Sequence, residues 1–248
     1  LNKTMENCKL ILHQKTKSAI EAAREKGRII TSLTARSDVN SRPVCEELEL
    51  VSLPVVTFGG AKIVSYPDDQ VLYQELHTSD MVRVVLHFAD QEKVYAQVYD
   101  GDVFCYNEET EESRYYAQRL GQQGRQVDFA TTSFDNSPKV LVTVQPEALP
   151  ALYEKAKVAL GDKYQITPSS QRFLEFYHLG NDKGMGLAWL GKHYGIMREE
   201  MIAMGDMAID APMLRYAGLG VAVENATQET KDAADLVTVS ADEDAVAH

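Results

Sequence analysis

Two carboxylates, Asp206 and Asp210, follow a short apolar run in the stretch Met201–Ala226. The run, Met201–Met204, is typical of a buried strand, and Gly205 breaks it. The carboxyl ends of parallel strands hold the chemistry of α/β proteins, and Mg²⁺ prefers one or two carboxylates plus phosphate oxygens. The spacing therefore indicates a Mg²⁺ site. It is also typical of a helix start, with Asp206 as N-cap and Asp210 as a first-turn acid.

Lys183 opens a segment with helical periodicity that ends before Gly195. A positive charge in the first turn of a helix opposes the helix dipole, so its presence requires a reason. A phosphate group bound at this helix end, with Lys183 as a point charge on it, would be such a reason. The alternative is a solvated surface lysine.

A short β-branched run, Arg28–Leu33, predicts a strand that ends at Thr34, Ala35 and Arg36. A hydroxyl, an arginine and backbone N–H groups at a strand end are suited to clamp a phosphate. Taken singly, Thr34 is also typical of an N-cap or a turn.

Composition limits the classes of partner. The chain has 248 residues, 44% of them apolar, which suffices for a core in one large domain or two small ones. A net charge of −12 argues against a nucleic-acid partner and predicts that any anionic substrate meets a local cationic pocket. No apolar run approaches the roughly 18 residues of a membrane helix, so we expect a soluble cytoplasmic protein without a membrane partner. Three cysteines without CxxC spacing fit a reduced compartment and no zinc site. No pattern indicates the oligomeric state.

Apolar periodicity predicts an α/β fold. The first quarter gives a helix from His13, the strand 28–33, a helix at 38–47 and a strand at 53–58, which is half of a doubly wound parallel sheet without its first strand. An inserted α+β layer follows, with predicted helices at 79–90, 111–120 and 147–160 and predicted strands at 94–99, 103–106, 139–144, 164–167 and 173–178. We therefore expect a core of residues 1–70 and 180–248, ending in a strand at 236–240, and an inserted domain of residues 71–179.

An ordered set of motifs resembles one known family. GDMAIDAPML with AGLGVAVENA, DKGMGLAWL before them, and TAR and TFGGA in the first quarter are similar to the haloacid dehalogenase (HAD) superfamily, in its Cof-type sugar-phosphatase branch. The similarity extends over nearly the whole chain. It implies a Rossmann-like core with an inserted cap, and Mg²⁺-dependent phosphoryl transfer from a small phosphorylated metabolite, commonly a sugar phosphate.

The resemblance assigns a role to each candidate residue. Asp206 matches the acid that binds Mg²⁺, and Asp210 matches the acid that supports the metal shell and its waters. Thr34 matches the hydroxyl that hydrogen-bonds the transferring phosphoryl group, and Lys183 matches the lysine that neutralises it. Arg36 stands where the branch has an arginine beside the substrate, and Ala35 lies between the two phosphate-side residues.

The chain departs from the family pattern at its start. The first motif of the family is Asp-x-Asp-Gly-Thr, whose first aspartate attacks phosphorus and whose second is the general acid and base. A gapless alignment places Leu1–Thr4 on its last four positions, so the nucleophile is expected immediately before Leu1. Asn2 then replaces the general acid, and its amide cannot give a proton to the leaving oxygen. The backbone carbonyl of Asn2 remains a candidate metal ligand.

Three further departures are Ala35 for the usual glycine, Gly59 for the usual asparagine, and Ile209 for the asparagine of the metal motif. Two hypotheses follow: a Mg²⁺-dependent phosphatase acting through an aspartyl-phosphate intermediate, or a catalytically inactive module that binds a phosphorylated ligand or a protein partner. A nucleotide-binding Rossmann protein is disfavoured, because no GxGxxG follows a strand.

Overall fold

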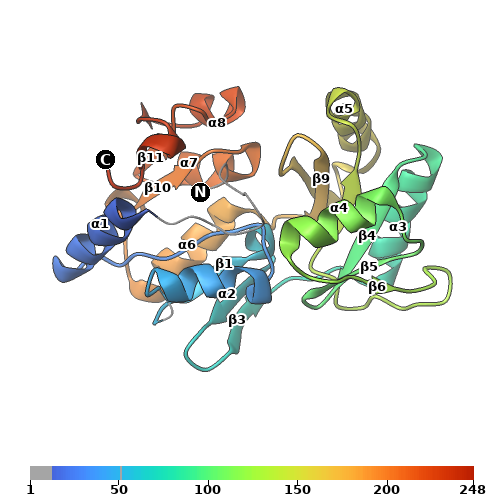
Figure 1. Cartoon of the computed structure of the whole chain (residues 1–248), viewed down its shortest axis with the longest axis horizontal. Helices are drawn as coiled ribbons and strands as arrows, with labels where there is room; N and C mark the ends of the chain where they lie inside the picture. Colours follow the sequence, from blue (N-terminus) through green and yellow to red (C-terminus); the bar gives the residue numbers. More distant parts are fainter. Residues whose placement is uncertain (1–12, 51) are drawn as a thin grey trace. The chain divides into compact units, whose positions relative to one another are not determined.

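A computed structural model describes residues 13–50 and 52–248 (Figure 1). They divide into two compact units. The split unit contains the described residues up to Leu72 together with Asp182–His248, and the inserted unit is Tyr73–Asn181. The helices and strands alternate along both units, so the predicted α/β class is confirmed.

The first half of the split unit packs two helices on a small sheet. The elements are α1 (Gln14–Glu25), α2 (Asp38–Glu47), β1 (Pro54–Thr57), β2 (Lys62–Ser65) and β3 (Gln70–Gln74), in sheet order β1-β2-β3. β1 and β2 are antiparallel, with Val55 opposite Val64, and Leu33 adds a single parallel bridge to Val56. A buried apolar cluster that includes Ile20 and Cys45 joins the helices to this sheet.

The second half of the split unit is a parallel sheet with helices. Its elements are α6 (Lys183–Tyr194), β10 (Ile202–Gly205), α7 (Ala211–Tyr216), β11 (Leu219–Ala222), α8 (Gln228–Asp232) and β12 (Leu236–Val237), with sheet order β10-β11-β12. Leu187 of α6 and Met213 of α7 pack with Ala203 of β10 in one cluster. This packing fixes the start of α6 beside the end of β10.

The inserted unit is built on a six-stranded sheet in the order β6-β5-β4-β7-β9-β8. Its elements are α3 (Ser79–Gln91), β4 (Tyr95–Asp100), β5 (Val103–Tyr106), α4 (Glu111–Leu120), β6 (Arg125–Gln126), β7 (Val140–Thr143), α5 (Leu149–Leu160), β8 (Tyr164–Pro168) and β9 (Phe173–His178). The main core combines α3 and α5 with alternate residues of the central strands, such as Val98, Val140 and Phe176. Phe173 is at a strand position that alternates with these core residues, so it lies on the other face of the sheet. Tyr116 of α4 packs against it there.

Several local predictions were wrong. Within the predicted strand 28–33 only Leu33 forms a bridge, to Val56, and the hydrogen bonds of this bridge run from the Val56 N–H to Ser32 O and from the Thr34 N–H to Val56 O. The other residues of this range belong to no strand. The sequence interpretation also missed β2, β3, β6, β11 and α8. These are short elements of two to five residues, so their periodicity is too weak to read, and β3 is largely exposed.

No helix among the described residues has the length and apolar character that crossing a membrane requires.

His77 is an unusual buried residue of the inserted unit. Its side chain is fully buried, and among the described residues neither ring nitrogen makes a hydrogen bond of ordinary geometry, although the backbone of Tyr177 lies close enough to affect the ring. The ring lies edge-on to Tyr164, with 5.6 Å between centroids, and 6.5 Å from the ring of His178. Burial, helped by the charge of His178 and opposed by the backbone of Tyr177, lowers the pKa of His77 from 6.5 to about 4.

We predict that His77 makes the inserted unit less stable as the pH falls. Because the folded-state pKa is depressed, the unfolded chain binds the extra proton between pH 6.5 and about 4, and stability is lost across that window. The expected loss from this residue is about 3 kcal/mol between pH 7 and pH 4. A His77→Phe variant lacks this part of the pH dependence. Hydrogen exchange of β7 and β9 amides at several pH values measures it.

The matched control for this experiment is His87→Phe, which changes an exposed histidine of α3 in the same unit. This control should retain the pH dependence of the wild type. An equal acid-induced loss of protection in the wild type and in His77→Phe would contradict the assignment.

Candidate active site

A cavity of about 210 Å³ in the split unit brings together five of the residues that the sequence singled out. Thr34, Arg36, Lys183, Asp206 and Asp210 all line it. They come from three separate segments: the loop before α2, the start of α6, and the loop after β10.

Other predicted and lining residues fall outside that set. Ala35 is half-buried and does not line the cavity, and Asn2 lies outside the described residues. Ser41 and Cys45 of α2 line the cavity as well, although no motif or periodicity indicated them. Their positions follow from the packing of α2 against β1, which no local pattern records.

The loop after β10 folds back so that the carboxylate of Asp210 caps its own start. Asp210 Oδ2 accepts hydrogen bonds from the backbone N–H of Asp206 at 2.9 Å and of Met207 at 3.0 Å. A Cβ atom on Gly205 would lie 2.4 Å from the Cβ of Asp210. Glycine is therefore required here, because any larger residue would push the carboxylate away from the two amides.

Lys183 is the partner of the other oxygen of this carboxylate. Its Nζ lies 2.5 Å from Asp210 Oδ1, and the two side chains are 8% and 5% exposed. Lys183 is the first residue of α6, after Asp182, whose side chain accepts a hydrogen bond from the Met185 N–H. The unfavourable position of a lysine at a helix start is thus offset by the negative charges of Asp210 and of the N-cap.

The two aspartates have opposite pKa shifts. Burial acts to raise the pKa of Asp210, but the charge and hydrogen bond of Lys183 and the two backbone N–H groups outweigh it, so the pKa is lowered. Burial and the adjacent negative charge of Asp210 raise the pKa of Asp206, and Lys183 only partly offsets them. Among residues 13–50 and 52–248, Lys183 forms its ion pair with Asp210 and not with Asp206. The negative charge of Asp206 is therefore less compensated than that of Asp210.

These donors fit Mg²⁺. Mg²⁺ typically takes one or two protein carboxylates and completes its shell with water and phosphate oxygens. Asp206 supplies an open carboxylate, whereas both oxygens of Asp210 are already engaged and hold the loop behind it. The described residues contain no group of three or more His, Cys, Asp or Glu side chains placed to hold a metal, which does not fit zinc or an all-protein calcium cage.

The loop of residues 34–36 is called the phosphate-side loop here, because the family resemblance assigns its residues to the phosphoryl group. Backbone hydrogen bonds join it to β1 and to the turn after β1. The Thr34 N–H donates to Val56 O at 2.8 Å, and the Gly59 N–H donates to Thr34 O at 2.9 Å. The Thr34 hydroxyl accepts from the Arg36 N–H at 3.1 Å, which leaves its proton available to donate to a ligand. Gly59 has a φ of +63°, a conformation that asparagine also tolerates, so the exchange of asparagine for glycine leaves this turn intact.

The sequence model of the haloacid dehalogenase-like hydrolases matches residues 4–248. The chain belongs to this family. Its predicted place in the Cof-type branch and the predicted HAD-like fold with a cap are confirmed.

Several relatives are named as phosphatases. The 5-amino-6-(5-phospho-D-ribitylamino)uracil phosphatase YitU of Bacillus subtilis is 27% identical over 251 residues, covering 95% of this chain and 88% of the relative. A haloacid dehalogenase-like hydrolase from Bacteroides thetaiotaomicron is 25% identical, with a TM-score of 0.80 over 96% of this chain and 91% of that structure. The HAD subclass IIB sugar phosphatase BT4131, 23% identical, shares the fold, with a TM-score of 0.83 over 95% of this chain and 89% of that structure.

We predict that Asp210→Ala destabilises the split unit by about 3–5 kcal/mol, because it leaves the buried ammonium of Lys183 without its partner and frees two amides. Glu47→Ala is the control, since it breaks the exposed Lys17–Glu47 ion pair, which should cost less than about 1 kcal/mol. Urea unfolding followed by the fluorescence of Trp189, the single tryptophan, measures both. Equal effects of the two substitutions would show that the buried pair is not structural.

Proposed function

We propose that this protein is a cytoplasmic phosphatase that hydrolyses small phosphomonoesters with Mg²⁺ bound at Asp206. The observation that carries the proposal is one cavity lined by a carboxylate that Lys183 only partly compensates, a buried lysine and a threonine hydroxyl from the loop before α2. The reaction proceeds through an aspartyl-phosphate intermediate, with the nucleophilic aspartate expected ahead of Leu1.

The described residues bind and stabilise the phosphoryl group. The Lys183 ammonium has three donors, so its bond to Asp210 leaves two for phosphate oxygens. The Thr34 hydroxyl donates to another oxygen, and Arg36 adds a second positive charge near the substrate. Bound Mg²⁺ would supply further charge stabilisation for the transferring group. Asp210 holds Lys183 and the Asp206 loop in place for this work.

The assigned role of Asn2 has a consequence for the substrate. With an amide at the position of the general acid, the leaving oxygen receives no proton from the protein, which removes a factor of about 10²–10⁴ in rate. Esters of acidic alcohols depend least on that proton. Turnover of p-nitrophenyl phosphate should therefore exceed turnover of sugar phosphates.

A second candidate function is a module that binds a phosphorylated ligand or a protein partner without turnover. The observation that favours it is Ile209, whose side chain is 6% exposed and places an apolar group where the branch has an asparagine. A buried isoleucine cannot orient metal-bound water. This candidate retains the phosphate-binding residues and loses only the chemical step.

We predict Mg²⁺-dependent release of phosphate by the full-length protein from p-nitrophenyl phosphate and from a panel of sugar phosphates. The panel includes 5-amino-6-(5-phospho-D-ribitylamino)uracil, because YitU is named for that substrate. Chelation of Mg²⁺ should abolish turnover, and Asp206→Asn should lower kcat/KM at least ~10²-fold, because the open carboxylate is lost. Asp69→Asn, the same exchange at an exposed site, should leave it unchanged.

The outcomes separate the two candidates. Turnover that needs both Mg²⁺ and Asp206 supports the phosphatase. Phosphate or substrate binding without turnover, by a folded protein, supports the inactive module. Turnover that persists in Asp206→Asn and in chelator rules out the proposed metal site.

A further inference from the structure

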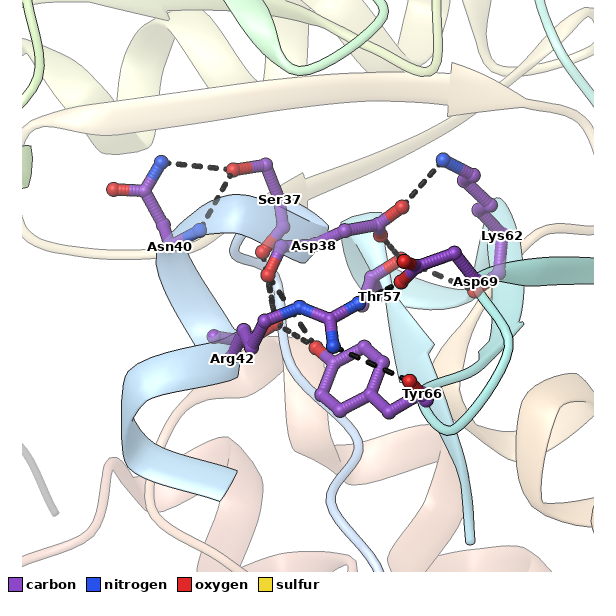
Figure 2. Close-up of polar contacts among 9 residues, drawn as sticks. Ser37, Asp38, Asn40, Arg42, Thr57, Lys62, Tyr66 and Asp69 are labelled. Atoms are coloured by element: carbon purple, nitrogen blue, oxygen red, sulfur yellow. Dashed lines mark hydrogen bonds and ion pairs between the residues drawn. The ribbon is translucent and has the colours of Figure 1, made fainter. Parts of the chain in front are cut away.

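A partly buried ion pair lies close to Arg36, which lines the cavity, and is not explained by the proposed reaction. The carboxylate of Asp38 pairs with the ammonium of Lys62, and the side chains are 11% and 18% exposed. The Thr57 hydroxyl donates to the other oxygen, Asp38 Oδ1, at 2.5 Å. Figure 2 shows the Asp38 carboxylate between Thr57 and Lys62. Both oxygens of a single carboxylate thus join the first turn of α2 to the end of β1 and the start of β2.

Backbone hydrogen bonds next to this ion pair also join the end of β1 to the loop before α2. Thr57 is followed by two residues whose N–H groups bind the phosphate-side loop: Phe58 donates to Arg36 O at 2.9 Å, and Gly59 donates to Thr34 O at 2.9 Å. Asp38 itself lies two residues after Arg36. The loop from Thr34 to Arg36 is therefore held between the Asp38 carboxylate on one side and the turn after β1 on the other.

Stability alone does not account for this arrangement. Removing two charges from water is costly, and a buried ion pair is often no more stabilising than apolar residues of similar volume. The neighbouring pair of Arg42 and Asp69 illustrates the contrast, because its side chains are 31% and 76% exposed (Figure 2). Arg42 also lies over the Tyr66 ring, 4.3 Å from its centroid. An ion pair removed from water can instead contribute specificity, because it holds the segments that carry it in one relative position.

We propose that Asp38, held by Lys62 and Thr57, is a positioning residue that sets the place of the Thr34 hydroxyl and of Arg36 for the phosphoryl group. The inference rests on the proposed phosphatase function. It adds Asp38 with its partners Lys62 and Thr57, none of which lines the cavity. The carboxylate fixes the start of α2, and through Phe58 and Gly59 the same clamp fixes the loop that carries the phosphate donors. Small displacements of such donors lower the rate strongly, because catalysis depends on their alignment.

The test uses the double variant Asp38→Asn with Lys62→Met in the full-length protein. This variant removes both buried charges, keeps an acceptor for Thr57 and leaves no unpaired ion, so it should fold with a melting temperature within a few degrees of the wild type. Either single variant removes the ion-pair partner of one charge and should melt lower. Asp69→Asn, the same acid-to-amide exchange in the exposed pair, is the matched control, and Lys62→Arg is the conservative variant that keeps the ion pair.

Two readouts are measured. With p-nitrophenyl phosphate and Mg²⁺ the double variant should lose about tenfold or more in kcat, with less than about a threefold change in KM, since the donors act chiefly on the transition state. Hydrogen exchange at the Phe58 and Gly59 amides should quicken by a similar factor. Asp69→Asn should match the wild type in both readouts. Lys62→Arg keeps the ion pair and should therefore retain most of the wild-type kcat.

The results separate the inference from the proposed function. If the wild type shows no turnover, the phosphatase proposal fails, and the exchange of the Phe58 and Gly59 amides still decides whether Asp38 positions the loop. If the wild type is active and the folded double variant has the same kcat and the same amide protection, the positioning role is overturned. A lower melting temperature with unchanged kcat identifies the pair as structural only, which also overturns it.

Discussion

The site depends on one buried carboxylate. Asp210 uses both oxygens to accept from three donors: the ammonium of Lys183 and the N–H groups of Asp206 and Met207. These bonds join the start of α6 to the loop after β10, two segments that are distant in the sequence. Because Asp210 is fully engaged, the charge of Asp206 remains open toward the cavity. The close approach that permits this requires glycine at position 205.

The charges that line the cavity explain how an acidic protein can receive a phosphate dianion. Among the described residues, two basic groups, Arg36 and Lys183, face two acidic groups, Asp206 and Asp210, so their formal charges sum to zero. Such a cavity by itself does not attract a dianion over a background of −12. A divalent cation at Asp206 would change the local balance to +2 and match the substrate. The cationic pocket predicted from composition therefore requires the metal.

The sequence predicted features with local signals and missed those created by tertiary structure. The helices 38–47, 111–120 and 183–194 were predicted with bounds that agree with the observed ones. In the structure, Ser37, Thr110 and Asp182 cap them, so these bounds are set by local interactions. The cavity residues were found because the motifs of the family carry them. The ion pair of Asp38 and Lys62 joins residues far apart in the chain, and neither residue type at its position signals the other. Such pairings follow only from the folded packing of α2 against β1 and β2.

The departures from the family pattern affect chemistry more than fold. Gly59 keeps the turn that asparagine would make, and Ile209 is packed in the interior, so neither disturbs the backbone that holds the cavity. Asp206 favours the proposed phosphatase over the proposed inactive module. A half-buried carboxylate with a raised pKa and no basic ion-pair partner among the described residues costs stability unless a cation meets it. Because a neutral residue would serve the fold better at this position, we infer that the charge of Asp206 is retained for the proposed metal ion.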